Sequence, residues 1–195
     1  NTSPVFILGN RYDNDDCQFS VINLSEQVGE RIKQCHEKYG EGTLVFGDSH
    51  ATNLYHSLVH NDENDNEHFL IGITKNGCHL PTNDANCQYA EILSFVSNYS
   101  EIFESIIYEK AGYLMLDFFG DRDNLRGDDA KLATIDYETI TGVVAYLSEL
   151  SNYSNITWFG PRIEPLIDEN ELYKRTCDFD YLLNDIHIES YVQID

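Results

Sequence analysis

A serine that could act as a nucleophile follows the apolar run at residues 44–46, in the stretch Gly47-Asp48-Ser49-His50-Ala51. The run is typical of a buried strand, Gly47-Asp48 of a turn, and residues 51–59 of a helix. A hydroxyl at such a corner lies at the carboxyl end of its strand, beside helix N–H groups that can bind an oxyanion. This placement suits acyl transfer, whereas the simpler interpretation is a serine that caps the helix.

Strands and helices alternate along the chain, which predicts an α/β fold with parallel strands, right-handed helical crossovers and helices on both faces of the sheet. Functional sites in such sheets lie at the carboxyl ends of the strands. We expect strands at residues 5–8, 43–46, 68–73, 113–118, 156–159 and 180–183. We expect helices at residues 25–39, 51–59, 89–110, 137–150 and 168–175, and a short one from residue 188.

Length, charge and hydropathy narrow the class of protein. The 195 residues contain 42% hydrophobic residues and no linker composition, so we expect a single domain over 1–195. The formal charge of −22 argues against nucleic acid and anionic lipid as partners. No apolar run approaches the roughly 20 residues that cross a bilayer, so we expect a soluble chain without direct membrane insertion. The acidic run at 61–67 lacks the glycine and distal glutamate of a calcium loop, and we expect no metal.

The five cysteines contain no C-x-x-C pair, which argues against zinc and thioredoxin-type sites. Cys17 and Cys35 flank a loop and a helix, and Cys78 and Cys87 enclose a short loop, so Cys17–Cys35 and Cys78–Cys87 are candidate disulfides in an oxidising compartment. Reduced, buried cysteines are the alternative. Cys177 is left over, either as a free thiol or with a partner outside these residues.

The Gly47-Asp48-Ser49 triplet after an apolar strand resembles block I of the SGNH (GDSL-like) hydrolases and acyltransferases. The longer form that runs on through His50 to Ala51 resembles the SGNH domains fused to acyltransferase-3 membrane proteins, which O-acetylate surface polysaccharides. The resemblance implies a three-layer α/β/α sandwich with a mostly parallel five-stranded sheet, a flavodoxin-like SGNH fold. It also implies cysteine pairs of this kind and a periplasmic location.

Within this resemblance, Ser49 is the nucleophile and the N–H of Gly77 completes the oxyanion hole. Without the resemblance, Gly77 could equally serve only a turn before a disulfide. Asp48 and His50 are supporting residues, and His50 either contacts substrate or has a local role at the helix start. The family's G-x-N-D block is missing after the strand expected at 113–118. Asp117 or Arg122 could approach the site there, but we favour ordinary loop roles for both.

The general base is predicted to be His187, in the stretch Asn184-Asp185-Ile186-His187. The family has D-x-x-H at this point, where His accepts the serine proton and Asp orients it. Asn184 stands in the place of that Asp, and Asp185 has only a D-x-H spacing, so activity could be low. The alternatives are that His187 is a surface residue or that the Asp/His pair lies beyond residue 195.

The expected function is that of a serine O-acetyltransferase that passes an acetyl group to a carbohydrate hydroxyl, as in lipopolysaccharide O-antigen. No cofactor is required, and the acetyl donor comes from a partner acyltransferase-3 membrane domain or from an acetyl ester substrate. We expect a soluble domain of a longer membrane-anchored protein, on the periplasmic or extracellular face. Alternatives are a carbohydrate O-acetylesterase and a non-catalytic carbohydrate-recognition module.

The sequence also contains N-x-S/T motifs, the acceptor pattern for N-linked glycans. With so many asparagines in the chain, chance could account for them, and they do not require a eukaryotic secretory origin. They begin at Asn1, Asn23, Asn98, Asn152 and Asn155.

Overall fold

The structure is a computed structural model that describes residues 17–61, 69–82, 84–111, 116–118 and 133–160. The chain divides into two compact units. One comprises Asn1–Ala111 and Glu138–Pro161, and the other comprises Gly112–Tyr137 and Arg162–Asp195.

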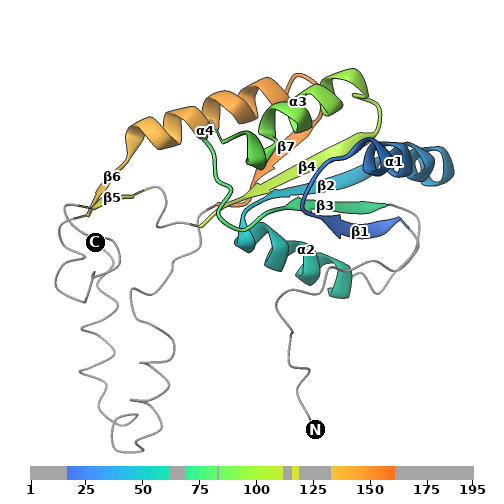
Figure 1. Cartoon of the computed structure of the whole chain (residues 1–195), viewed down its shortest axis with the longest axis horizontal. Coiled ribbons are helices and arrows are strands. Elements are labelled where there is room, and N and C mark those ends of the chain that lie inside the picture. The colour runs from blue at the N-terminus through green and yellow to red at the C-terminus, as the bar shows by residue number, and fades with distance from the viewer. Residues whose placement is uncertain (1–16, 62–68, 83, 112–115, 119–132, 161–195) are drawn as a thin grey trace, which may run out of the picture. The chain divides into compact units, whose positions relative to one another are not determined.

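The first unit contains a five-stranded sheet in which every pair of neighbours is parallel, which confirms the expected α/β class. The strand order across the sheet is β1-β3-β2-β4-β7 (Figure 1). The strands are β1 (Gln18–Val21), β2 (Gly42–Gly47), β3 (Leu70–Thr74), β4 (Phe103–Glu109) and β7 (Asn155–Trp158).

The helices are α1 (Glu26–Tyr39), α2 (Ser49–Asn61), α3 (Tyr89–Asn98) and α4 (Tyr137–Leu150), with a 3-10 turn η1 (Ala85–Cys87). Local sequence explains the ends of α1. Ser25 accepts a hydrogen bond from the N–H of Val28 at the start, and Gly40 adopts φ 79° at the end, where its N–H bonds the carbonyl of His36. The expected helix at 25–39 and its glycine stop are therefore confirmed.

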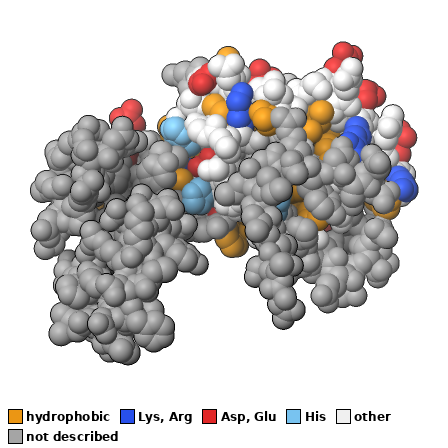
Figure 2. All heavy atoms as spheres, turned by 60° about the horizontal axis from the view of Figure 1, so that its bottom comes forward, with side chains coloured by type: hydrophobic (Ala, Val, Ile, Leu, Met, Phe, Trp, Pro, Cys, Tyr) orange, Lys and Arg blue, Asp and Glu red, His pale blue; other side chains and the backbone are white. Residues whose placement is uncertain are grey.

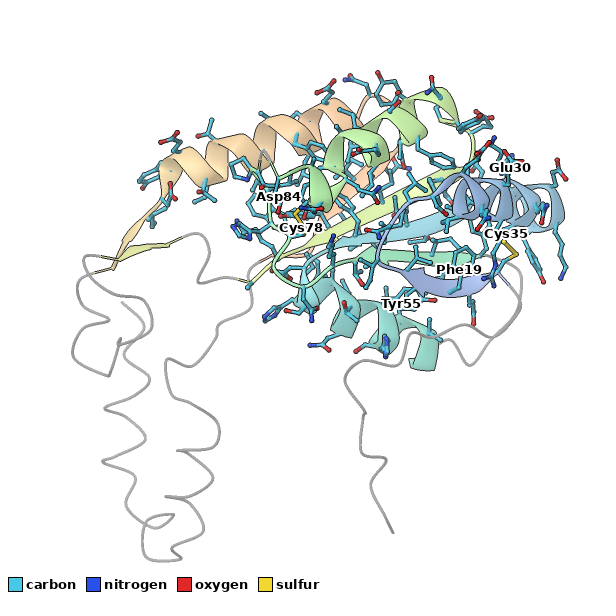
Figure 3. The ribbon with its side chains drawn as sticks, in the orientation of Figure 1. Phe19, Glu30, Cys35, Tyr55, Cys78 and Asp84 are labelled. Atoms are coloured by element: carbon cyan, nitrogen blue, oxygen red, sulfur yellow. A yellow bond between two sulfur atoms is a disulfide. The ribbon has the colours of Figure 1, made fainter. Side chains whose placement is uncertain are left out.

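The alternation of side chains along the strands builds a core on each face of the sheet. Leu44 and Phe46 of β2 belong to one buried cluster, together with residues of α1, α3 and α4. Val45, which points the other way, belongs to a second cluster with Leu54 and Tyr55 of α2. In Figure 1, α1, α3 and α4 lie on one side of the sheet and α2 on the other, and Figure 3 shows Tyr55 directed from α2 toward the strands.

Two expected elements were wrong. The helix expected at 89–110 ends at Asn98, and the chain then enters β4, so the parallel strand after β3 is Phe103–Glu109 rather than 113–118. Leu116–Phe118 instead forms β5, which pairs antiparallel with β6 (Ala133–Ile135) in a separate two-stranded sheet of the second unit. No glycine or proline occurs between residues 89 and 110 to mark the change from helix to strand.

The edge strand β1 was not expected from the sequence, because its four residues include a polar Gln18 and Ser20. The disulfide Cys17–Cys35, present in the structure, links the residue before β1 to α1. The strands expected at 5–8 and 180–183, the helix at 168–175 and the short one from 188 lie outside the described residues. On the face seen in Figure 2, acidic side chains outnumber basic ones among the described residues, in agreement with the net charge of −22.

Candidate active site at the carboxyl ends of β2, β3 and β4

Between β2 and β4 the connections of the sheet diverge, because the chain runs from β2 to β3 on one side and from β4 to β7 on the other. The chain leaves β2 through α2, on one face of the sheet, and returns from β4 to β7 through α4, whose buried residues belong to the cluster on the other face. In open parallel sheets, ligands bind outside the carboxyl ends of the strands at such a divergence. Ser49 follows β2 at this point, so topology and motif indicate the same location.

Ser49 is the first residue of α2 and is exposed, and it does not cap that helix. The cap is Asp48. Its carbonyl accepts the N–H of Thr52 at 3.2 Å, and its Oδ1 accepts the N–H of His50 at 2.9 Å. The simpler interpretation of Ser49 as a helix cap is therefore wrong, and its hydroxyl stands at the surface beside the positive end of α2.

The carboxylate of Asp48 also joins the turn to the neighbouring strand. Its Oδ2 accepts the N–H of Ala111 at 2.8 Å, and the side chain is only 2% exposed. One buried carboxylate thus holds the start of α2 and the end of β4 together. These bonds define the position of Ser49 relative to β2, which it follows, and to β4.

Replacing Asp48 by Ala should lower the free energy of unfolding by about 2–3 kcal/mol, because two charge-assisted hydrogen bonds are lost and two backbone donors lose their partner. Urea denaturation measures this. Asp84→Ala is the matched control, since exposed Asp84 accepts the N–H of Asn86 at 2.9 Å in the same way at η1. Equal losses in the two variants would contradict a bridging role for Asp48.

Gly47 allows the strand ends to approach closely. It has φ 142°, and a Cβ built on it would lie 1.9 Å from the carbonyl oxygen of Glu109. Its own carbonyl accepts the N–H of Lys75 at 3.0 Å. The turn before Ser49 is therefore enclosed by the ends of β3 and β4, and no larger residue fits at this position.

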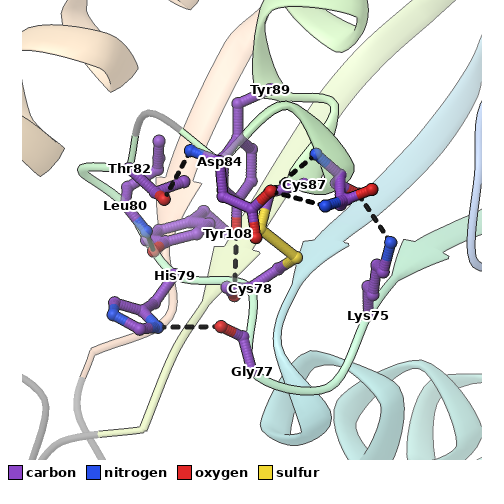
Figure 4. Close-up of a disulfide and its surroundings, with 11 residues drawn as sticks. Lys75, Gly77, Cys78, His79, Leu80, Thr82, Asp84, Cys87, Tyr89 and Tyr108 are labelled. Carbon is purple, nitrogen blue, oxygen red and sulfur yellow. Dashed lines mark hydrogen bonds between the residues drawn. A yellow bond between two sulfur atoms is a disulfide. The ribbon is translucent and has the colours of Figure 1, made fainter.

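Gly77 lies in a tight turn just after β3. The N–H of Cys78 bonds the carbonyl of Lys75 at 3.0 Å, and Gly77 has φ 78°, the left-handed conformation that favours glycine. Its carbonyl lies 3.1 Å from Nδ1 of His79 (Figure 4). Gly77 is exposed at the same sheet edge as Ser49. Its N–H as an oxyanion donor stays a prediction.

Several contacts hold the loop that follows Gly77 (Figure 4). The disulfide Cys78–Cys87 closes it, and the hydroxyl of Tyr89 donates to the carbonyl of Cys78 at 2.9 Å. The N–H of Leu80 donates to the hydroxyl of Tyr108 at 3.2 Å. Burial raises the pKa of both tyrosines well above the usual value, so both stay protonated at neutral pH.

Sequence reasoning missed two charged residues at the end of β4, Glu109 and Lys110, because that segment was assigned to a helix. Both are fully buried, which is rare for charged side chains. Nζ of Lys110 donates to the carbonyl of Leu80 at 2.9 Å, so it joins the end of β4 to the Gly77 loop. The β-branched pair Ile106-Ile107 between polar residues was the available strand signal.

We expect Lys110→Met to lower kcat for ester substrates about tenfold to a hundredfold, because it releases the loop that carries Gly77. Lys75→Met is the matched control, since Nζ of Lys75 donates to the carbonyl of Asn86 at 2.7 Å in the same loop but in an exposed setting. Steady-state kinetics of both variants, with circular dichroism to verify folding, measure the effect. Equal kcat values would show that Lys110 does not position the loop.

The predicted residues His187, Asn184 and Asp185, and also Cys177 and Arg122, lie outside the described residues. Asp117 lies in β5 of the second unit. Within the described residues, no group of three or more His, Cys, Asp or Glu side chains could hold a metal ion. Two open surface hollows in this part of the chain lie along α1 and between α1 and α3, and neither is lined by Ser49.

Comparisons with protein-family models, with curated proteins and with solved structures find no match to the chain. Among the helices of the described ranges, none is long and apolar enough to span a membrane.

Proposed function

We propose that this chain is an O-acyltransferase domain that transfers an acetyl group to a carbohydrate hydroxyl through an acyl-enzyme on Ser49. The observation that carries the proposal is the division of roles at the start of α2. Asp48 takes the capping hydrogen bonds, and this leaves the Ser49 hydroxyl exposed at the divergence of the sheet.

In the proposed reaction, Oγ of Ser49 attacks the acetyl carbonyl and its proton passes to His187. The N–H groups of Ser49 and Gly77 bind the oxyanion, and the donor's alcohol leaves with the proton from His187. A sugar hydroxyl then attacks the acetyl-serine and its proton passes to the histidine. The histidine then gives this proton to Oγ of Ser49 as the acetylated sugar leaves.

The finer fold proposal is a three-layer α/β/α sandwich of the SGNH type. The separate buried clusters on the two faces of the sheet support it. The acetyl donor would be a membrane acyltransferase-3 domain of the parent protein, and the location would be the periplasmic or extracellular face. The two disulfides are consistent with an oxidising compartment.

An esterase would use the same residues, with water in place of the sugar. Asn184, where an orienting acid is expected, favours the third candidate, a non-catalytic carbohydrate-binding module. Without a carboxylate, the imidazolium of His187 lacks charge stabilisation, and the Asp-to-Asn change costs about four orders of magnitude in a well-known serine protease.

The test uses the full chain with p-nitrophenyl acetate as donor, with and without an unacetylated oligosaccharide. We expect an acetyl group on the Ser49 peptide by mass spectrometry, and acetylated sugar in excess of free acetate when the oligosaccharide is present. His187→Ala should abolish turnover, and Asn184→Asp, which completes D-x-x-H, should raise it. Acetate without acetylated sugar would identify an esterase. No turnover in the native chain or in Asn184→Asp would favour the binding module over both enzymes.

A further inference from the structure

Three N-x-S/T motifs lie at the edge of the sheet opposite to Ser49. Asn98 is the last residue of α3, shortly before β4 begins, Asn152 lies in the turn after α4, and Asn155 is the first residue of β7. Each segment leads into the amino end of a strand, whereas Ser49 follows the carboxyl end of β2. The motifs therefore gather at the end of the sheet where its strands begin, which we call the amino edge.

Each motif has its asparagine at the surface and its middle residue against the core. Asn98, Asn152 and Asn155 are all exposed. Tyr99, Tyr153 and Ile156, which follow them, pack against the first buried cluster. The inward residue of each motif packs against the core, and the asparagine before it faces solvent, where a glycan can be attached.

The hydrogen bonds of these amides are compatible with a glycan. Nδ2 of Asn152 donates to the carbonyl of Glu149 at 3.0 Å, and Nδ2 of Asn98 lies 3.5 Å from the hydroxyl of Ser94. An asparagine amide carries two N–H groups, and glycosylation at Nδ2 replaces one of them. The other can keep the local contact, so modification does not require the turn to rearrange.

The disulfides are consistent with the secretory compartment in which N-linked glycans are added. Cys17–Cys35 and Cys78–Cys87 are both formed in the structure. Disulfides persist in the secretory lumen and outside the cell, and an exposed N-x-S/T motif in a chain passing through that lumen is a glycan acceptor.

We propose that the amino edge of the sheet carries N-linked glycans, one on Asn98 and at least one at the junction of α4 and β7, on Asn152 or Asn155. The glycans shield this edge and leave the carboxyl edge with Ser49 open. Asn23 begins a further motif, but it follows the carboxyl end of β1 and is therefore outside the proposal. The proposal does not depend on the acyl chemistry proposed for Ser49.

The test is to secrete the full chain from eukaryotic cells and to release the glycans with an amidase in heavy-oxygen water, which converts each occupied Asn to labelled Asp. We expect the label at Asn98 and at Asn152 or Asn155, and none at Asn86, which is exposed but has no motif. Ser100→Ala should remove the label from Asn98, and Ser100→Thr should keep it. Ester turnover should be unchanged in both variants, since Ser100 lies at the amino edge.

Secreted protein with both disulfides formed and no label at any of the three asparagines would overturn the proposal. So would a label at Asn98 that persists in Ser100→Ala. Because glycan occupancy is read by mass spectrometry without substrate, its failure is distinguishable from failure of the acyltransferase proposal.

Discussion

Ser49→Ala should lower kcat/KM for p-nitrophenyl acetate by at least about three orders of magnitude, because loss of the nucleophile ends the acyl-enzyme route. The Ser49 side chain is exposed, and Asp48 rather than Ser49 caps α2. The substitution should therefore leave the free energy of unfolding within about 0.5 kcal/mol of the native value. A large kinetic loss without a loss of stability is the signature of a nucleophile.

The matched control is Ser57→Ala on the same helix. The hydroxyl of Ser57 donates to the carbonyl of Asn53 at 2.9 Å, in an exposed position two turns away. Turnover in this variant should equal that of the native chain. Ester hydrolysis that survives Ser49→Ala unchanged would exclude Ser49 as the nucleophile and would leave the acyltransferase proposal without its central residue.

Gly47→Ala should destabilise the fold by at least about 3 kcal/mol. Two costs combine, since the new Cβ would collide with the carbonyl oxygen of Glu109 and φ 142° is strained for any residue with a side chain. The ends of β2 and β4 are forced apart, so the bond from Ala111 to Asp48 should be lost as well. Urea denaturation followed by circular dichroism measures the change, and ester turnover should fall with it.

The control Gly40→Ala separates the cost of the positive φ from the cost of the collision with Glu109. Gly40 also has a positive φ of 79°, but a Cβ there would meet nothing within 4 Å, so its replacement should cost only about 1–2 kcal/mol. A loss for Gly47→Ala no larger than for Gly40→Ala would mean that the close approach to Glu109 is not essential to the fold.

Much of the architecture was predictable from local signals. Helix α1 has a serine at its start and a glycine at its end, and α4 covers 137–150 as expected. Strand β2 is a continuous apolar run with Gly47-Asp48 after it, which is a strong turn signal. These elements depend on residues close together in sequence, so the sequence pattern was sufficient to find them.

The segment after α3 could not be assigned in this way. Its apolar residues suit either a longer helix or a strand, and pairing with β2 decides between them, with Val45 opposite Ile107 and Gly47 opposite Glu109. Such pairing joins residues about 60 positions apart, which no local pattern reveals. As a result Glu109 and Lys110, at the end of β4, were missed as parts of the candidate site.

By itself, the sequence determined that Ser49 stands on a strand-to-helix turn of an α/β chain, because side-chain periodicity and turn residues act over a few positions. Tertiary structure decided which residue caps α2, which strand lies beside that turn and what holds the Gly77 loop. Those depend on contacts such as Asp48 with Ala111 and Lys110 with Leu80, between segments that meet only when the sheet forms. The exposed hydroxyl of Ser49 is a consequence of those contacts.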